Sequence, residues 1–209
     1  MTFLKQLYPL RKKISCVLVV FFFASSIAWA QNVQVFFSPQ GGCTRAAIAH
    51  IAEARQTLNI AMYSLTSDDI VQEIVRVKNK GVKTRVICDK TQKGQKSSQI
   101  GFLKSQGVAV RIYQGPGLMH NKFAVIDQKV LITGSFNWTQ NAEEDNAENL
   151  LVLSDKKLIA SYTKEFEHLW VQGQEEEMPQ DLKEVTRDVQ KFFRRLFKDI
   201  LKMILRMQK

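Results

Sequence analysis

The sequence has few cysteines, no long apolar run and no internal repeat. Three cysteines occur among 209 residues, and none belongs to a Cys-x-x-Cys pair or a Cys/His array, so a zinc site is not expected. The longest apolar run, residues 14–23, is shorter than the roughly 20 residues that a bilayer span needs. Because nothing repeats, a candidate active site has to come from motifs that occur once in the chain.

Acidic residues are also scarce relative to basic ones. Thirty Lys and Arg against 20 Asp and Glu give a formal charge of +10. This charge favours polyanionic partners, such as nucleic acid or an anionic membrane surface, without choosing between them. The length and the 45% share of hydrophobic residues suit one globular domain of ordinary size.

Residues 1–30 have the three-part pattern of a secretory signal peptide. Basic residues precede the apolar run, and small residues follow it up to Ala30, after which we expect cleavage. We therefore predict an exported protein, periplasmic or secreted, or a membrane-tethered one if the signal is not cleaved. Export would leave Cys43 and Cys88 where disulfides persist, and both a bridge and two buried free thiols stay open.

From residue 33 onward, short strand-like runs alternate with amphipathic helical stretches. We expect strands at 33–37, 58–63, 83–88, 108–113, 122–126, 130–133 and 149–153, and helices at 44–56, 68–80, 98–105 and 155–171. Strands and helices in alternation predict an α/β fold with helices on both faces of the sheet. Only three residues separate 122–126 from 130–133, so this pair must be an antiparallel hairpin in a mixed sheet.

The composition divides the rest of the chain. We expect the globular domain over residues 31–173, a polar, Glu-rich linker over 174–180, and a basic amphipathic helix over 181–209. Docking on the domain or on a partner subunit, binding to an anionic membrane surface, and contact with nucleic acid all stay open for this helix.

One run of residues carries the candidate chemistry. His120, Lys122, Asp127, Ser135 and Asn137 fit the pattern H-x-K-x4-D-x6-G-S-x-N without gap or substitution. A chance match in a chain of this length has odds on the order of one in a few hundred thousand. His120 and Lys122 lie two residues apart on an extended segment, so their side chains project to the same side.

This set of side chains suits a phosphodiester. A neutral imidazole can attack phosphorus while the ammonium of Lys122 and the neutral donors Ser135 and Asn137 hold the phosphoryl oxygens. The lysine supplies the positive charge that a metal supplies elsewhere, so we expect no metal and no other cofactor. The leaving oxygen still needs an acid on the opposite face, and the chain has one motif.

With this motif, the run 134–139 and the segment 146–149, the sequence resembles the phospholipase D superfamily over residues 33–172, in particular its secreted, single-motif Nuc-type endonucleases. The resemblance implies a phospholipase D-like fold and a homodimer in which two copies of His120 meet, one forming a phosphohistidine and the other acting as acid and then base. It also implies that Glu148 accepts a hydrogen bond from His120. Asp127 lies at the hairpin turn, where we expect it to brace the fold or interface, and it ranks below Glu148 as a catalytic group.

Other polar and aromatic residues have two interpretations each. Trp138 could stack on a base or lie buried beneath the site. Lys90, Lys93 and Lys96 could contact a nucleic-acid backbone or simply be solvated. We expect His50 and His168, which lie in helical stretches without a partner motif, to be structural.

These observations give three hypotheses for function. The leading one is a metal-independent endonuclease of low sequence specificity that cuts DNA, with RNA as a second substrate. The alternative keeps the chemistry and makes the substrate a membrane phospholipid, as in a small phospholipase D or phosphatidyl transferase. The third is a non-catalytic nucleic-acid-binding protein of the cell envelope.

Overall fold

The computed structural model describes residues 33–175, 187–189 and 191–198. The predicted signal peptide, most of the predicted linker and parts of the predicted C-terminal helix lie outside the described residues. In the described part, the strands are β1 (Val33–Ser38), β2 (Thr57–Met62), β3 (Lys83–Cys88), β4 (Ala109–Tyr113), β5 (Lys122–Ile126), β6 (Val130–Gly134), β7 (Glu148–Leu153) and β8 (Gly173–Glu175). The helices are α2 (Cys43–Ala52), α3 (Asp68–Asn79), the short 3-10 helix η1 (Lys90–Gln92), α4 (Ile100–Ser105), α5 (Gln140–Glu144) and α6 (Lys156–Gln172).

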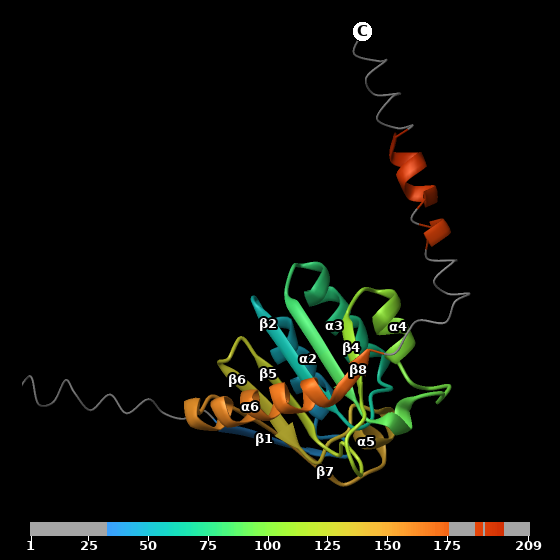
Figure 1. Cartoon of the computed structure of the whole chain (residues 1–209). Coiled ribbons are helices and arrows are strands. Elements are labelled where there is room, and N and C mark those ends of the chain that lie inside the picture. Colours follow the sequence, from blue (N-terminus) through green and yellow to red (C-terminus); the bar gives the residue numbers. More distant parts are fainter. Residues whose placement is uncertain (1–32, 176–186, 190, 199–209) are drawn as a thin grey trace, which may run out of the picture. The chain divides into compact units, whose positions relative to one another are not determined.

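The strands form one mixed sheet in the order β1-β7-β6-β5-β2-β3-β4-β8 (Figure 1). Strands β2, β3 and β4 run parallel, while β5 is antiparallel to β2 and forms the expected hairpin with β6. The predicted mixed α/β sheet is therefore confirmed. One strand was not predicted: β8 occupies the start of the expected linker and pairs antiparallel with β4.

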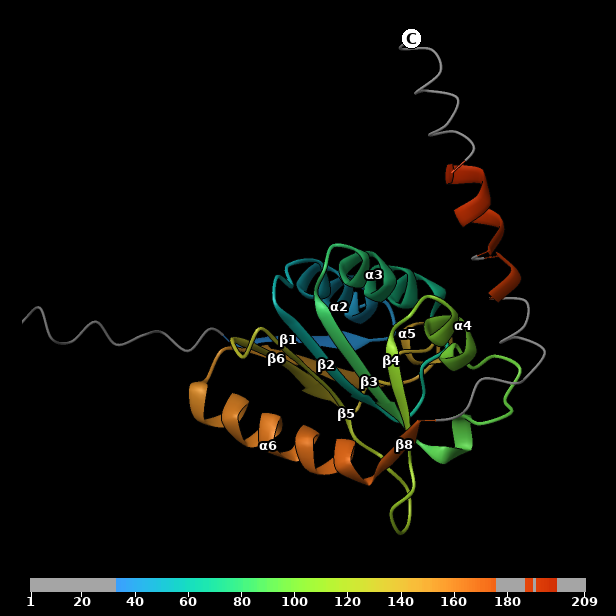
Figure 2. The same ribbon diagram turned by 45° about the horizontal axis from the view of Figure 1, so that its top comes forward.

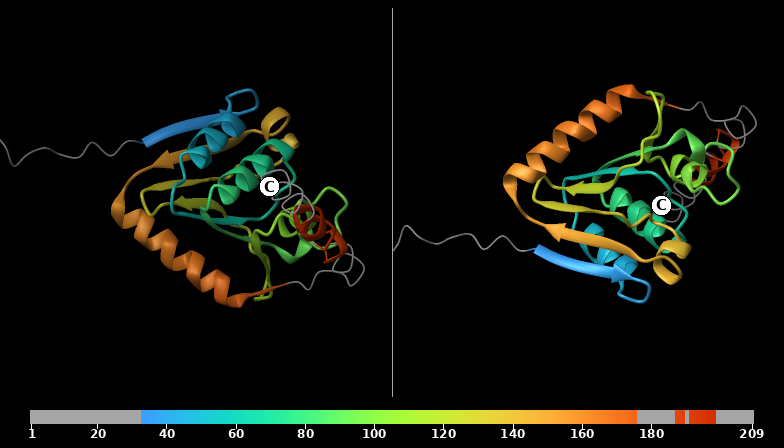
Figure 3. Two further views of the ribbon diagram at one scale, coloured as in Figure 1. Left: turned by 90° about the horizontal axis from the view of Figure 1, so that it is seen from above. Right: turned by 90° about the horizontal axis from the view of Figure 1, so that it is seen from below.

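Helices cover both faces of the sheet. Figure 2 shows α2 and α3 on one side and α6 on the other, and the views in Figure 3 show the same separation. Along β2, Ile60 and Met62 belong to the core beneath α2 and α3, whereas Ala61 belongs to the core beneath α6. This alternation follows from the period of two in a strand. All residues of the central strand β5 are buried as a result.

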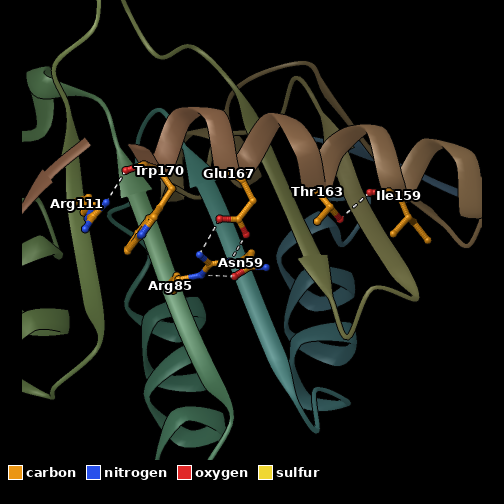
Figure 4. A network of polar contacts seen from close by, with 7 residues as sticks. All are labelled: Asn59, Arg85, Arg111, Ile159, Thr163, Glu167 and Trp170. Carbon is orange, nitrogen blue, oxygen red and sulfur yellow. Dashed lines mark hydrogen bonds and ion pairs between the residues drawn. The ribbon is translucent and has the colours of Figure 1, made fainter. Parts of the chain in front are cut away.

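Arginines on the sheet fix α6 in place (Figure 4). The Nε of Arg85 donates to Asn59 at 2.9 Å, its guanidinium pairs with Glu167 of α6, and it lies 4.8 Å from the ring centroid of Phe166. The hydrogen bond from Arg85 holds the pKa of Glu167 below its ordinary value. Cations over aromatic rings and a paired carboxylate thus orient this helix on its face.

Both cysteines outside residues 1–30 are free thiols. Cys43 at the start of α2 and Cys88 at the end of β3 are fully buried and unbridged. Burial raises the pKa of Cys43 to about 11 and that of Cys88 to about 12. Of the two arrangements left open by the sequence, the structure has the two buried thiols.

Parts of the C-terminal segment are helical. Residues 187–189 and 191–198 form helical turns with exposed apolar side chains, among them Phe192, Phe193 and Phe197. The rest of the predicted 181–209 helix lies outside the described residues. Within the part of the chain that the structure describes, no helix has the length and apolarity to span a bilayer.

The hairpin between β5 and β6 is tied to the loop that precedes β2. Asp127 and Gln128 have φ values of 51° and 53°, as in the tight turns whose twist suits hairpins. The carboxylate of Asp127 accepts hydrogen bonds from the backbone N–H groups of Arg55, Gln56 and Thr57 at 2.8 to 2.9 Å. Burial acts to raise the pKa of Asp127, but these bonds outweigh it, so the pKa lies below the ordinary value of 3.8.

The end of β6 requires a glycine. Gly134 has a φ of +148°, and a Cβ built there would lie 2.2 Å from the carbonyl oxygen of Asn149 on β7. Any larger residue would therefore push β6 and β7 apart next to Ser135.

We predict that Asp127→Ala lowers the free energy of unfolding by about 2–3 kcal/mol at neutral pH, because three backbone donors lose a charged acceptor. A lowered native pKa gives stability that is present above the unfolded value and is lost as pH falls through the native value. The difference between wild type and variant should therefore shrink below about pH 3.8 in urea titrations. Asp155→Ala, which removes the cap on Leu158 of α6, is the control and should cost about 1 kcal/mol; equal losses at Asp127 and Asp155 would contradict the prediction.

Gly134→Ala should lower the free energy of unfolding by more than about 1 kcal/mol, because the added Cβ meets backbone at a φ that alanine rarely adopts. Thermal melts followed by circular dichroism measure this. Gly101→Ala is the matched control, since a Cβ at this position in α4 meets nothing within 4 Å, and it should be neutral or stabilising by up to about 1 kcal/mol. A Gly134→Ala protein as stable as Gly101→Ala would show that β6 and β7 adjust freely.

Candidate active site

One edge of the sheet collects the residues of the motif. Strand β2 ends at this edge, β5 begins there because it is antiparallel to β2, and β6 and β7 meet there as a second antiparallel pair. Met62 is aligned with Lys122, and Gly134 with Leu150. Residues that lie far apart in the sequence are thereby placed at the same end of adjacent strands.

His120 and Lys122 are in direct contact. The Nζ of Lys122 lies 3.2 Å from Nδ1 and 3.4 Å from Nε2 of His120, and donates to the His120 carbonyl oxygen at 2.8 Å. His120 is exposed, whereas Lys122 is 8% exposed. A solvent-facing imidazole therefore lies against an ammonium held within the protein.

Lys122 is a desolvated charge. Burial lowers the pKa of Lys122, and the negative charge of Glu148 acts in the opposite direction. An ammonium that has lost part of its hydration interacts more strongly with an incoming anion than one in bulk water. The position of Lys122 therefore suits charge stabilisation at a phosphate.

An aromatic residue that the motif does not include also contacts the pair. The ring centroids of Tyr63 and His120 are 4.3 Å apart, and the Nζ of Lys122 lies 5.0 Å from the Tyr63 centroid. Sequence reasoning missed Tyr63, although its place after β2, where loops of α/β sheets meet ligands, was a usable signal.

Ser135 and Asn137 follow β6. The Oγ of Ser135 accepts hydrogen bonds from the backbone N–H of Asn149 at 3.0 Å and from its side-chain amide at 3.3 Å. Since Ser135 accepts both bonds, its own hydrogen remains to be donated. The Oδ1 of Asn137 is buried and has no hydrogen-bond partner among the described residues.

Glu148 lies at the same edge but is not bonded to the histidine. Its carboxylate accepts a hydrogen bond from Asn146 at 3.5 Å, and within residues 33–175 it makes none with His120. Burial lowers the pKa of Lys122, and the negative charge of Glu148 offsets part of this lowering. The role of Glu148 in orienting the imidazole stays a prediction from the resemblance.

Asp127 is not brought to the histidine. Asp127 directly follows the last residue of β5, whereas His120 lies two residues before the first residue of β5. The length of the strand therefore separates them. Its three bonds to the loop before β2 are those of a brace for the fold.

A second buried carboxylate supports the loop that carries His120. Asp89, fully buried after β3, accepts hydrogen bonds from the backbone N–H of Met119 at 2.7 Å and of Thr91 at 2.8 Å. Burial acts to raise the pKa of Asp89, but these bonds and the charge of Lys90 bring it below the ordinary value. Sequence reasoning missed Asp89 because its partner lies 30 residues away.

The structure decides between the open interpretations of Trp138. Trp138 is 1% exposed, and its backbone bonds to Ser64, Thr66 and Ser67, so it is a core residue.

The exposed residues Lys90, Lys93 and Lys96 lie on the loop that follows Asp89.

The two remaining histidines lie on helices. His50 is 3.7 Å from Glu53, and His168 contacts Gln172 at 2.8 Å. In the described part of the chain, no group of three or more His, Cys, Asp or Glu is arranged to hold a metal ion.

Comparison with known proteins identifies the family. Residues 47–170 match the family described as cardiolipin synthase, PLD-like domain. The mitochondrial cardiolipin hydrolase of Chlamydomonas reinhardtii is 43% identical over 121 residues, which are 58% of this chain and 54% of that protein. The human mitochondrial cardiolipin hydrolase is 39% identical over 119 residues, 57% of this chain and 47% of that one. The chain thus spans about half the length of these curated relatives.

Similar proteins from bacteria include a phospholipase D and two solved structures. Phospholipase D of Rickettsia prowazekii (strain Madrid E) is 36% identical over 131 residues, 63% of this chain and 64% of that protein. The crystal structure of Nuc, a phospholipase D family member from Salmonella typhimurium, has a TM-score of 0.68 at 28% identity and covers 71% of this chain and 99% of that one. NucT from Helicobacter pylori has a TM-score of 0.66 at 30% identity, over 68% and 98% of the two chains.

These relatives contradict the localisation predicted from the sequence. The prediction of an exported, periplasmic or secreted protein, or of a tethered form of it, is wrong, because similar proteins are named as mitochondrial cardiolipin hydrolases and as a rickettsial phospholipase D. The error has a physical source, since a basic stretch followed by a short apolar run reports the hydropathy of a segment and not its compartment.

The matched residues, the mixed eight-stranded sheet and the likeness to Nuc agree with one another. This chain therefore belongs to the phospholipase D superfamily and is a member of its single-domain Nuc type.

Proposed function

We propose that this chain is a metal-independent phosphodiesterase in which His120 is the nucleophile. The observation that carries the proposal is the contact between the buried ammonium of Lys122 and the exposed imidazole of His120. A phosphate that binds at this ammonium is placed beside a ring nitrogen that solvent and substrate can reach. Proximity of this kind supplies much of the rate gain in nucleophilic catalysis.

The proposed reaction has two displacements. A ring nitrogen of His120 bonds to phosphorus as the ester oxygen leaves with a proton from an acid on the opposite face. Lys122, Ser135 and Asn137 hold the non-bridging oxygens during this step. Water then attacks the phosphorus of the phosphohistidine, and the former acid removes a proton from this water. The bond between phosphorus and nitrogen breaks, which releases His120.

The acid on the opposite face is proposed to be His120 of another copy of the chain. Each chain has one motif, and its first two residues, His120 and Asn121, are both exposed. Two copies meeting around a two-fold axis would bring two such histidines to one phosphate.

For the substrate, we propose nucleic acid, cut with little sequence preference. The exposed lysines 90, 93 and 96 lie on the loop that Asp89 connects to Met119, next to the nucleophile. An exposed basic loop that begins beside the segment of the nucleophile suits a polyanionic backbone. The likeness to Nuc, over 99% of that chain, also supports this substrate.

The second candidate substrate is a membrane phospholipid. Leu118, two residues before His120, is 52% exposed, which places an apolar side chain on the surface of the segment that leads to the nucleophile. The relatives named cardiolipin hydrolase support this substrate. The exposed phenylalanines of residues 191–198, which alternate with Lys191, Arg194, Arg195 and Lys198, would suit contact with an anionic surface.

We expect the purified protein to cleave plasmid DNA in excess EDTA and His120→Ala to lose at least about a thousandfold in rate, because the nucleophile is removed. His168→Ala, which changes an exposed histidine on α6, is the control and should cleave normally. Cardiolipin vesicles assayed in parallel distinguish the two substrates. Loss of DNA cleavage on chelation would contradict metal-independent chemistry, and DNA binding without cleavage by either form would indicate a non-catalytic protein.

We expect wild-type/His120→Ala mixed dimers, purified through two different tags, to retain less than about a tenth of wild-type activity, because each composite site would lack one histidine. Independent sites would retain about half. Mixed dimers of wild type and His168→Ala provide the matched control. A monomer in light scattering that is fully active would contradict the composite site.

A further inference from the structure

The end of β2 is joined to the segment that carries the nucleophile. The backbone N–H of Tyr63 donates to the carbonyl oxygen of Asn121 at 2.9 Å. Asn121 is the residue between His120 and Lys122, so this bond fixes the backbone of the pair relative to Tyr63. The aromatic ring is thereby held at the same place as the reacting groups.

The ring contacts both members of the pair. Its plane is inclined by 52° to the His120 ring at a centroid distance of 4.3 Å, and the Lys122 ammonium lies 5.0 Å from its centroid. Aromatic rings at this separation attract, and an ammonium is attracted to the face of a tyrosine. One side chain therefore contacts both the ammonium and the imidazole.

His120 needs such a support. It is exposed, and its ring is contacted by the side chains of Lys122 and Tyr63. An exposed histidine without a packing surface samples several rotamers, whereas an attacking nitrogen has to lie within a few tenths of an ångström of its productive position. The ring of Tyr63 removes rotamers that would turn the imidazole away from Lys122.

We propose that Tyr63 is a positioning residue whose aromatic face holds the imidazole of His120 against Lys122. This inference rests on the proposed function of His120 as nucleophile. The face, and not the hydroxyl, carries the role, because both contacts are made to the ring and the hydroxyl has no hydrogen-bond partner among residues 33–175.

Two substitutions separate the ring from the hydroxyl. Tyr63→Phe keeps the face and should retain kcat within about twofold. Tyr63→Leu keeps apolar bulk without the face and should lower kcat at least about tenfold, with KM changed by less than about threefold, because the loss lies in the orientation of the nucleophile. The assay uses bis(4-nitrophenyl) phosphate, a diester with neither base nor acyl chain, so that the result does not depend on the natural substrate.

A spectroscopic readout tests the packing directly. In proton NMR, the ring protons of His120, assigned through His120→Ala, should show the ring-current shift of a neighbouring aromatic in wild type and Tyr63→Phe, and lose it in Tyr63→Leu. The matched control is Tyr162→Leu, which removes a half-buried aromatic of α6 that contacts Phe123. This variant should be less stable, yet keep both kcat and the His120 resonances.

The outcomes are distinct. Equal losses in Tyr63→Phe and Tyr63→Leu would overturn the proposal in favour of the hydroxyl, and normal kcat in Tyr63→Leu would overturn it entirely. His120 resonances that do not respond to Tyr63→Leu would also overturn it, whether or not the diester is cleaved. Diester hydrolysis that survives His120→Ala would instead refute the proposed function, which identifies that failure separately.

Discussion

The antiparallel pairing of β5 with β2 is the constraint on which the site depends. It aligns Lys122 with Met62, so the residues just beyond each strand, His120 and Tyr63, meet at one edge of the sheet. Because helices cover both faces, the strand edge is where polar groups of β5 can reach solvent. A shift of one residue in this register would turn His120 and Lys122 together to the opposite face and separate both from Tyr63.

Two buried or half-buried carboxylates maintain that geometry from opposite ends. Asp127 binds three backbone donors at the far end of β5, and Asp89 binds two at the near end. Each holds a loop by charge-assisted hydrogen bonds, which are about twice as strong as neutral ones. The motif aspartate is therefore structural in its contacts, and an aspartate outside the motif lies nearer to the chemistry.

The reacting group of nucleic acid and of a phospholipid is the same phosphodiester. The residues that contact the phosphate can therefore be identical for both substrates. The loops of this chain carry both kinds of surface residue, since Lys90, Lys93 and Lys96 follow β3 and Leu118 precedes His120, and all four are exposed. Residues on loops are therefore the ones that can distinguish substrates in this fold, whereas residues at the strand ends contact the phosphate.

The strand and helix alternation, the β5–β6 hairpin and the motif could be predicted from the amino-acid sequence, because each depends on residues close together in the chain. The contact between His120 and Lys122 follows from a spacing of two on an extended segment. The folded chain was needed to show that Tyr63 contacts this pair and that Asp89 binds Met119 in the loop before it. It also showed that Trp138 is buried, that Cys43 and Cys88 are unbridged, and that β8 adds an eighth strand. These features arise from contacts between distant segments, and no local pattern specifies which buried carboxylate or aromatic ring will meet which loop when the sheet is assembled.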